Sequence, residues 1–232
     1  MYVFGKNVAE EMLASNKQIN KVFISDKFND DKILTELRKK NIKTIKVAKY
    51  ELDQKVSGLH QGIVLDVPNY KYKTLEDVLN KEDSLFVILD HIEDPHNFGA
   101  IIRTCEAAGV DAIIIPEDRS VDVNGTVVKT SVGTAERMNI VRVKNIVNTI
   151  TKLKKEGFWI FGTDMDGTDY STLDYRGKCA VICGNEGSGM SRLVKENCDY
   201  IASIPMKGTV NSLNASVATA IIIFEAVKIR GK

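Results

Sequence analysis

The chain of 232 residues has few of the side chains that build metal sites and disulfide frameworks. It contains three histidines, His60, His91 and His96, and four cysteines. Cys179 and Cys183 flank three apolar residues in a segment that reads as a strand, which is the wrong spacing for a zinc knuckle or a redox pair. We therefore predict no metal site, and free thiols in a reduced, intracellular protein.

Long apolar runs and a strong net charge are also missing. No stretch reaches the roughly 18 consecutive apolar residues of a membrane span, and residues 1–13 lack the apolar centre of a signal peptide. The net charge of +1 gives the whole chain no electrostatic preference for nucleic acid or membranes. With 44% hydrophobic and 27% charged residues, the composition is that of an ordinary globular protein, and we expect it to be cytoplasmic.

Positive charge is nevertheless concentrated in residues 32–49, which carry seven bases against a single acid, Glu36. A basic patch can be the electrostatic footprint of a phosphate-binding surface. A solvated helix face would give the same pattern, and the sequence leaves both explanations open.

Hydrophobic patterning divides the chain into two domains joined by a linker. Residues 1–67 alternate short strand and helix signals, which predicts a small α/β domain. Residues 68–83 have few core signals, and we predict a linker there. In residues 84–232, apolar strands alternate with helices, which predicts an α/β domain with a parallel, doubly wound sheet. Its expected strands are residues 85–89, 112–115, 140–143, 158–161, 180–183 and 201–204, and its expected helices are residues 98–108, 146–155 and 215–227.

Polar, glycine-bearing loops follow four of these strands, at residues 91–99, 162–167, 184–189 and 207–214. Ligands of open parallel sheets bind beyond the carboxyl ends of the strands, where such loops meet. Residues 184–189 read G-x-x-G-x-G, which is neither the dinucleotide fingerprint nor a phosphate-binding loop, since no G-K-[ST] follows. Their glycines permit close approach to a flat ligand, although a tight turn explains them equally well.

The helix at residues 98–108 carries polar groups on an apolar background. Asn97 stands at the expected N-cap position. Arg103 and Glu106 are three residues apart and so share a helix face. An arginine among apolar neighbours needs a partner, which is either Glu106 or a bound anion.

Residues 204–227 combine three patterns, and Pro205 ends the strand because proline has no N–H to donate. A loop of small polar residues follows, and then an apolar helix from Ala215. This stretch is either an ordinary strand–loop–helix connection or part of a ligand site.

Three motifs together resemble the SpoU (TrmH-like) family of RNA ribose 2′-O-methyltransferases. They are Asn97-Phe98-Gly99 with Arg103, Gly184-Asn185-Glu186-Gly187-Ser188-Gly189, and Ile204-Pro205-Met206 followed by Asn211-Ser212-Leu213-Asn214-Ala215-Ser216. Residues 1–67, with His60-Gln61-Gly62, resemble the small RNA-binding domain of the RlmB-like branch, which methylates a guanosine of 23S ribosomal RNA. The partner that this resemblance implies is 23S rRNA or an assembling large-subunit particle. The resemblance implies a trefoil-knotted, SPOUT-type parallel-sheet domain, S-adenosylmethionine as methyl donor, and a homodimer formed through the C-terminal domain.

The resemblance also implies roles for individual residues. Catalytic roles fall to Arg103, Asn97, Glu106, Glu186, Ser212 and Asn214. The cofactor would be bound by Thr163, Gly184, Glu186, Gly187, Ile204, Met206, Ser212, Leu213 and Ser216. Candidate RNA contacts are Arg103, Lys39, Lys40, Lys43 and His60.

The roles that the resemblance implies for Arg103 include that of general base, which conflicts with the chemistry of its side chain. Guanidinium stays protonated in proteins, and a nearby carboxylate favours the charged form further. We therefore predict that Arg103 positions a phosphate and polarises the ribose hydroxyl, with the proton acceptor unassigned.

Rival functions are methylation of tRNA instead of rRNA, a non-catalytic RNA-binding module, and a hydrolase or NTPase that uses residues 184–189 as a phosphate cradle.

Overall fold

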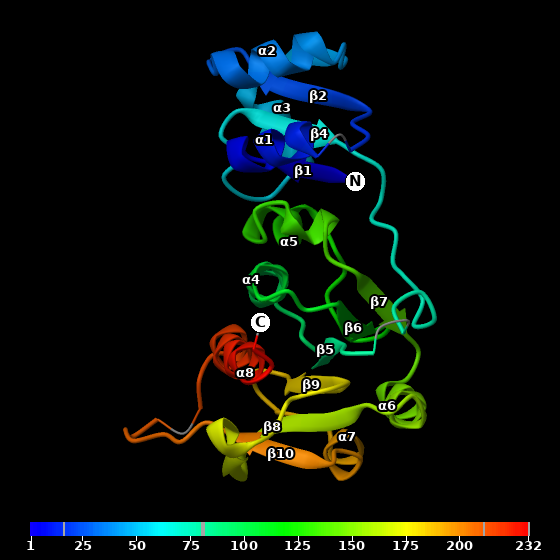
Figure 1. Ribbon diagram of the computed structural model, residues 1–232. Helices are drawn as coiled ribbons and strands as arrows, with labels where there is room; N and C mark the ends of the chain where they lie inside the picture. The colour runs from blue at the N-terminus through cyan, green and yellow to red at the C-terminus, as the bar shows by residue number, and fades with distance from the viewer. Residues whose placement is uncertain (16, 80–81, 211, 232) are drawn as a thin grey trace. The chain divides into compact units, whose positions relative to one another are not determined.

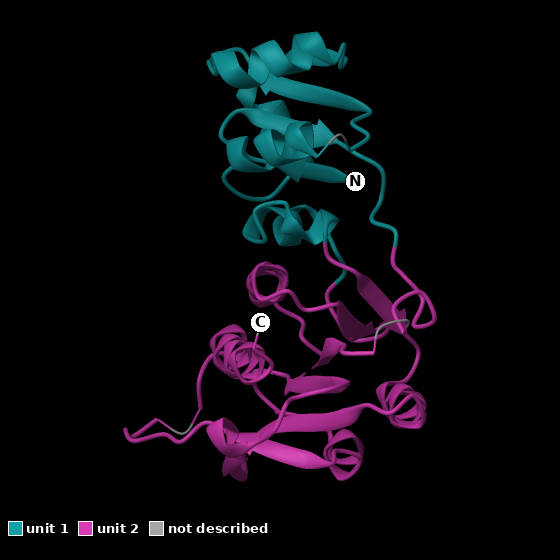
Figure 2. Ribbon diagram, in the orientation of Figure 1, with its two compact units in different colours: residues 1–71, 122–137 teal, residues 72–121, 138–232 magenta. Residues whose placement is uncertain are grey.

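The structure is a computed structural model that describes residues 1–15, 17–79, 82–210 and 212–231 (Figure 1). The chain forms two compact units (Figure 2). Unit 1 contains residues 1–71 and 122–137, and unit 2 contains residues 72–121 and 138–232. The grouping of residues 122–137 with the N-terminal segment was not predicted from the sequence.

Unit 1 is a small α/β fold with a mixed four-stranded sheet in the order β1-β4-β2-β3. β2 and β3 are parallel, and β4 is antiparallel to both β1 and β2. The elements of the N-terminal segment are β1 Tyr2–Phe4, α1 Lys6–Ala14, β2 Lys21–Ser25, α2 Asp31–Lys39, β3 Thr44–Val47, α3 Lys49–Lys55 and β4 Ile63–Asp66. The second segment adds α5 Gly125–Thr130 and a 3-10 turn at Thr134–Glu136.

Helix α5 packs against β1 because a glycine begins it. A Cβ atom on Gly125 would lie 2.3 Å from the carbonyl oxygen of Tyr2, so a larger residue would push the helix away. Asn124 caps the helix by accepting from the backbone N–H groups of Thr126 and Val127. Lys129 then donates from Nζ to the carbonyl oxygen of Leu59 at 2.6 Å.

Unit 2 contains a six-stranded sheet in the order β10-β8-β9-β5-β6-β7, and every pairing in it is parallel. The predicted parallel-sheet α/β fold with a small N-terminal α/β unit is therefore confirmed. The elements are β5 Leu85–Asp90, α4 Pro95–Ala107, β6 Ala112–Pro116, β7 Ile140–Val143, α6 Ile146–Lys155, β8 Trp159–Asp169, a 3-10 turn at Tyr170–Thr172, β9 Cys179–Gly184, α7 Arg192–Glu196, β10 Tyr200–Ser203 and α8 Ala215–Ile229.

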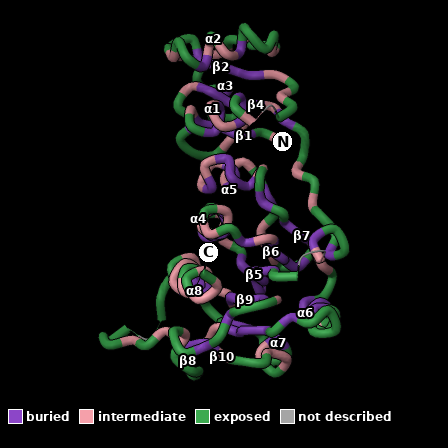
Figure 3. The backbone as a smooth tube through the Cα atoms, viewed as in Figure 1, coloured by how far each residue is buried: buried purple, intermediate pink, exposed green. Residues whose placement is uncertain are grey.

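Helices cover both faces of this sheet (Figure 1). α4 and α8 pack together on one face, and α6 and α7 share a hydrophobic core with the strands on the other. Central strands β5 and β6 are buried along their whole length, as their continuous apolar sequences require (Figure 3). In the described part of the chain, no helix is long and apolar enough to cross a bilayer.

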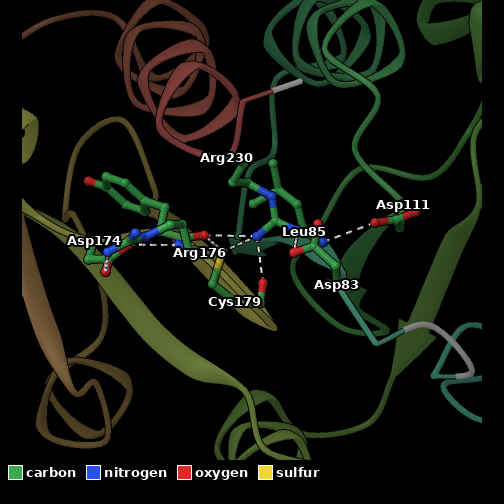
Figure 4. Close-up of polar contacts among 9 residues, drawn as sticks. Asp83, Leu85, Asp111, Asp174, Arg176, Cys179 and Arg230 are labelled. Atoms are coloured by element: carbon green, nitrogen blue, oxygen red, sulfur yellow. Dashed lines mark hydrogen bonds and ion pairs between the residues drawn. The ribbon is translucent and has the colours of Figure 1, made fainter.

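The end of α8 is fixed by the side chain of Arg230, which is 1% exposed. Its guanidinium donates to the carbonyl oxygens of Tyr175 at 2.8 Å and Gly177 at 2.5 Å, and pairs with Asp83 at 2.5 Å (Figure 4). Removing one partner of a buried charge is costly. Arg230 therefore ties α8 to the amino-terminal ends of β5 and β9. The polar loops leave from the opposite, carboxyl-terminal ends of the strands.

Candidate active site

Three of the polar loops follow neighbouring strands and lie at the carboxyl-terminal ends of those strands. β10, β8 and β9 are adjacent and parallel, so residues 204–213, 163–167 and 185–189 all follow carboxyl ends at the same side. The link from β5 to α4 leaves the next strand in this order. The predicted meeting of these loops is therefore a consequence of strand order.

The loop after residue 162 projects from within β8. Gly162 pairs with Ile201, whereas the next paired residue, Thr168, opposes Ala202. Residues 163–167 have no counterpart in β10 and so leave the ladder. Ser203 holds this excursion by donating from Oγ to the carbonyl oxygen of Met165 at 2.8 Å. The strand predicted at residues 158–161 thus continues beyond the loop, to Asp169.

Asp164 ties the same excursion to α7 through an ion pair with Lys195 at 2.8 Å. Partial burial acts to raise the pKa of Asp164. The hydrogen bond from Lys195, together with the N–H of Asp166, outweighs this and holds the pKa below its ordinary value.

Asn185 organises the loop that follows β9. Its Oδ1 accepts from the backbone N–H groups of Gly187 at 2.9 Å and Ser188 at 3.3 Å, and its Nδ2 donates to the carbonyl oxygen of His91 at 2.7 Å. A Cβ atom on Gly184 would lie 2.3 Å from backbone atoms of residues 189 and 190, so this turn closes only around glycine. The result is a rigid turn with its peptide groups at the sheet edge.

Asp90 supports the turn from β5. It is 1% exposed, and its carboxylate accepts from the backbone N–H of Ser191 at 2.7 Å and contacts Nδ1 of His91 at 2.5 Å. Sequence reasoning missed Asp90 and Asn185 as site residues. The available signal was the position of Asp90, a lone carboxylate ending a fully apolar strand.

Asn97 joins the three motif segments. Its Nδ2 donates to Oε1 of Glu186 at 2.6 Å, and its Oδ1 accepts from Nδ2 of Asn214 at 2.9 Å. The amide orientation follows from its partners, because an ionised carboxylate only accepts. With 9% exposure, Asn97 is a buried polar group whose amide is used on both sides.

The prediction that Asn97 caps α4 is wrong. The cap is Asp94, which accepts from the N–H groups of His96 at 3.0 Å and Asn97 at 3.3 Å. The helix begins at Pro95, earlier than predicted, and proline suits a first helical position. Asn97 is thereby left to bind across the site.

Asn214 has a second role, as the cap of α8. Its Oδ1 accepts from the N–H of Ser216 at 3.0 Å and from Ser216 Oγ at 2.6 Å, while its Nδ2 is bound to Asn97. The start of α8 is thus fixed to α4, as its end is fixed by Arg230.

Arg103 and Glu106 lie elsewhere on α4. Arg103 is exposed and Glu106 is half-buried. At about 100° per residue, Arg103 lies about 120° around the helix from Asn97. Arg103 and Glu106 share a face, as predicted, but it differs from the face that carries Asn97.

Cys183 lies next to the cofactor candidate Thr163. Burial raises the pKa of the Cys183 thiol to about 11, although the hydroxyls of Thr219 and Thr163 oppose the shift by hydrogen bonding to the sulfur. The thiol is therefore protonated at neutral pH and packs as an unreactive core side chain.

Comparison with known proteins identifies these features. A family model described as the SpoU rRNA Methylase family matches residues 84–224, the segment that holds all three motifs. The chain belongs to this family. A second model, described as RNA 2′-O ribose methyltransferase substrate binding, matches residues 2–73.

Relatives of this SpoU family chain match it over nearly its whole length. YacO of Bacillus subtilis, assigned to the TrmH family of tRNA/rRNA methyltransferases, is 39% identical over 238 residues, which cover 99% of this chain and 96% of YacO. A Staphylococcus epidermidis protein with the same assignment is 41% identical over 239 residues. The matched region covers 98% of this chain and 95% of the Staphylococcus protein. The crystal structure of AviRb from Streptomyces viridochromogenes with AdoMet superimposes with a TM-score of 0.81 at 26% identity, covering 98% of this chain and 89% of AviRb.

Within this SpoU methylase fold, the predicted site residues other than Arg103 and Glu106 fall into three groups. Asn97, Glu186, Asn214 and Ser216 form one hydrogen-bonded chain. Thr163, Gly184, Gly187, Ile204, Met206, Ser212 and Leu213 lie on the three loops at the same sheet edge. Lys39, Lys40, Lys43 and His60 belong to unit 1. Asn211 lies outside the described residues.

Proposed function

We propose that this protein transfers a methyl group from S-adenosylmethionine to a ribose 2′-hydroxyl of RNA, and that its substrate is a guanosine of 23S rRNA. The observation that carries the proposal is the bond of Asn97 to both Glu186 and Asn214, which joins three separate motifs at one edge of the sheet. Membership of the SpoU rRNA methylase family supports the reaction. Action in the cytoplasm is part of the proposal.

The loops at this edge suit S-adenosylmethionine. Residues 186–189 of the turn after β9 are exposed, and the neighbouring loops expose apolar side chains for a flat base. Met165 is 57% exposed, Val210 62% and Leu213 37%. This apolar surface fits an adenosine-based cofactor better than a nucleoside triphosphate, because no G-K-[ST] sequence is present to bind phosphates. AviRb, of the same fold, was crystallised with AdoMet.

The cofactor, when bound, supplies an electrophilic methyl group, and the chain supplies orientation. Asn97, Glu186 and Asn214 hold the loops in a fixed relation to α4. Arg103, exposed on α4, binds a phosphate of the RNA and polarises the hydroxyl. Glu106, Ser212 and Ser216 complete the proposed site around these groups.

We also propose that the protein is a homodimer through its C-terminal domain. Helix α8 is apolar on nearly all sides, and Val217 and Phe224, two turns apart, are 48% and 50% exposed. Exposed apolar residues at this spacing form a stripe that a second copy would cover. The trefoil knot, and a division into domains at residues 1–67 and 84–232 with a linker at 68–83, belong to the same proposal.

Two measurements test the function. Calorimetry should detect S-adenosylmethionine binding, whereas no binding would favour a non-catalytic RNA-binding module. Mapping of 2′-O-methylation in RNA from cells with and without the protein should then show the loss of one guanosine mark in 23S rRNA. A mark lost from tRNA instead would move the substrate to the tRNA class.

Gly184→Ala is expected to lower the affinity for S-adenosylmethionine by at least tenfold. The added Cβ would meet backbone atoms 2.3 Å away and force the turn open. Gly208→Ala is the matched control in the adjacent loop, because its Cβ would meet nothing within 4 Å. Calorimetry on both variants checks the expectation, and equal affinities would remove residues 184–189 from the cofactor site.

Neutralising Lys39, Lys40 and Lys43 with glutamine is expected to weaken RNA binding and to flatten its salt dependence. Each lost phosphate contact lowers the slope of log affinity against log salt by about 0.7 to 0.9. Lys39 already pairs with Glu36 at 2.7 Å, which reduces its contribution. A salt series on a labelled rRNA fragment measures the slope, and an unchanged slope would leave residues 32–49 as a solvated face.

A further inference from the structure

Unit 1 contains a cavity of about 420 Å³ that none of the predicted site residues explains, apart from His60. Four segments build it: the start of α1, the end of β2 with the turn after it, α3, and residues 58–62. The volume lies within the range of small-molecule sites, which are about 300–1,000 Å³.

His60 makes the cavity rigid. The imidazole is buried, with 4% exposure. Its Nδ1 accepts from the backbone N–H of Gly62 at 3.0 Å, so Nε2 carries the hydrogen and donates to Asp53 at 2.9 Å. Gly62 has φ of +82°, and a Cβ there would lie 2.8 Å from Ser25 Oγ. His60 thus ties residues 58–62 to α3, and both of its ring nitrogens are used in these bonds.

Three lysines give the cavity its charge. Lys27 and Lys49 are exposed, and no carboxylate pairs with either among the residues that the structure describes. Lys6 pairs with Asp30 at 3.0 Å. The acidic lining residue Asp53 accepts a hydrogen bond from His60. Two lysines are therefore available to an anion.

The walls of the cavity are apolar. Phe28 is half-buried, and the ammonium of Lys6 lies 5.4 Å from the centre of its ring. Leu59, also in the lining, is 72% exposed. An anion-binding mouth beside apolar surface matches a nucleotide, which combines a phosphate with a flat base.

We propose that this cavity binds one unpaired nucleotide of the RNA substrate, with Lys27 and Lys49 on the phosphate and the base against Phe28 and Leu59. The proposal rests on the proposed function for the identity of the RNA. Only a nucleotide in a loop or single strand can turn its base into such a cavity, because the bases of a duplex are stacked inside it. His60 acts as a positioning residue that keeps the cavity open.

The first test compares the full-length protein with Lys27→Gln/Lys49→Gln. The probes are a fluorescein-labelled single-stranded 12-mer RNA of mixed sequence and the same 12-mer as a blunt duplex. Affinity for the single strand should fall about tenfold, with its salt slope reduced by about 1.4 for two lost contacts. Affinity for the duplex should change less than about threefold, because a duplex cannot turn a base into the cavity. A loss caused by bulk charge alone would be equal on both RNA forms.

Lys71→Gln/Lys155→Gln is the control, because it removes the same charge from exposed positions outside the cavity. An equal loss in the control, or equal losses on both RNA forms, would overturn the proposal. So would wild-type affinity in the cavity variant.

A second variant, Leu59→Ser, tests the base-binding wall without touching charge. Its exposed position leaves folding intact. Single-strand affinity should fall about threefold to tenfold with the salt slope unchanged. NMR titration of the labelled protein with uridine 5′-monophosphate should shift the signals of residues 58–62 at lower concentration than inorganic phosphate does. Equal effects of the two probes would reduce the cavity to a phosphate site and overturn the nucleotide assignment.

S-adenosylmethionine calorimetry on the same variants separates this proposal from the function. The cavity variants should bind the cofactor with wild-type affinity, because every residue changed lies in unit 1 and the loops proposed for the cofactor lie in unit 2. A wild-type protein without cofactor binding would contradict the proposed reaction, while the single-strand measurements would still decide the cavity.

Discussion

Arg103→Lys is expected to lower the rate of RNA methylation by about 100-fold or more, with S-adenosylmethionine affinity unchanged. Lysine keeps the positive charge but loses the planar fork that binds a phosphate through two donors and holds it in one orientation. Arg103 is exposed on α4, so the substitution leaves the core intact. Single-turnover methylation of rRNA, together with a thermal melt, measures the effect.

Arg192→Lys is the matched control, an exposed arginine of the same unit that pairs with Glu196 at 2.7 Å. It should methylate at the wild-type rate. Near-wild-type turnover of Arg103→Lys would contradict the positioning role.

The pH profile of Arg103→Lys separates positioning from general base catalysis. A lysine, with an ordinary pKa of about 10.4, loses its proton far more readily than a guanidinium. If residue 103 were the base, the activity of the variant would rise steeply towards pH 10 and approach that of the wild type. A positioning role instead predicts a deficit that persists across this range.

Asn97→Asp is expected to lower the free energy of unfolding by about 2–4 kcal/mol at pH 8 and to abolish methylation. The two side chains have nearly the same shape, so no cavity forms. The variant replaces the Nδ2 donor, which is 2.6 Å from Glu186 Oε1, with an acceptor that carries negative charge. Two carboxylates at this distance repel each other unless they share a proton. Denaturant unfolding measures the change.

The stability deficit of Asn97→Asp should depend on pH. In the folded variant the shared proton raises the pKa of the carboxylate pair above the ordinary value of about 4 that both groups keep when unfolded. The folded state then binds more protons than the unfolded state, so stability falls as pH rises through the raised pKa. The deficit should be largest at pH 8 and shrink towards pH 5, whereas a deficit independent of pH would contradict the geometry.

A second substitution should reverse the loss. In Asn97→Asp/Glu186→Gln, the amide at residue 186 becomes the donor and the carboxylate at residue 97 the acceptor. Asn214 still donates to residue 97, as it does at 2.9 Å in the wild type. Recovery of at least half of the lost stability at pH 8 is expected, and additive losses in the double variant would show that the two residues do not interact.

Much of the site was accessible from the sequence because its signals are local. Continuous apolar strands such as residues 85–89 predicted a parallel sheet buried on both faces, and the polar loops after them predicted where a ligand would lie. The motif residues around Asn97, Glu186 and Asn214 were identified by their resemblance to the motifs of the SpoU family. The small N-terminal α/β unit also followed from local patterning.

Residue contacts across long sequence separations were decided by tertiary structure. Asn97 was predicted to cap the helix, but Asp94 is the cap. The amide of Asn97 instead binds Glu186 and Asn214, which are 89 and 117 positions away in the sequence. The partners of the His60 ring, Asp53 and the backbone of Gly62, were likewise not evident from the sequence. No local pattern predicts such partners, because each depends on how strands distant in sequence are ordered in the sheet.

By itself, the sequence determined the fold class and the loops that carry the motifs, since strand and helix periodicity and turn residues act over a few positions. The partners of Asn97 and the grouping of residues 122–137 with unit 1 were set by the tertiary structure. So was the anchoring of α8 at Asn214 and at Arg230. The physical reason is burial: a buried amide or guanidinium must find its hydrogen-bond partners in whichever segments the fold brings next to it.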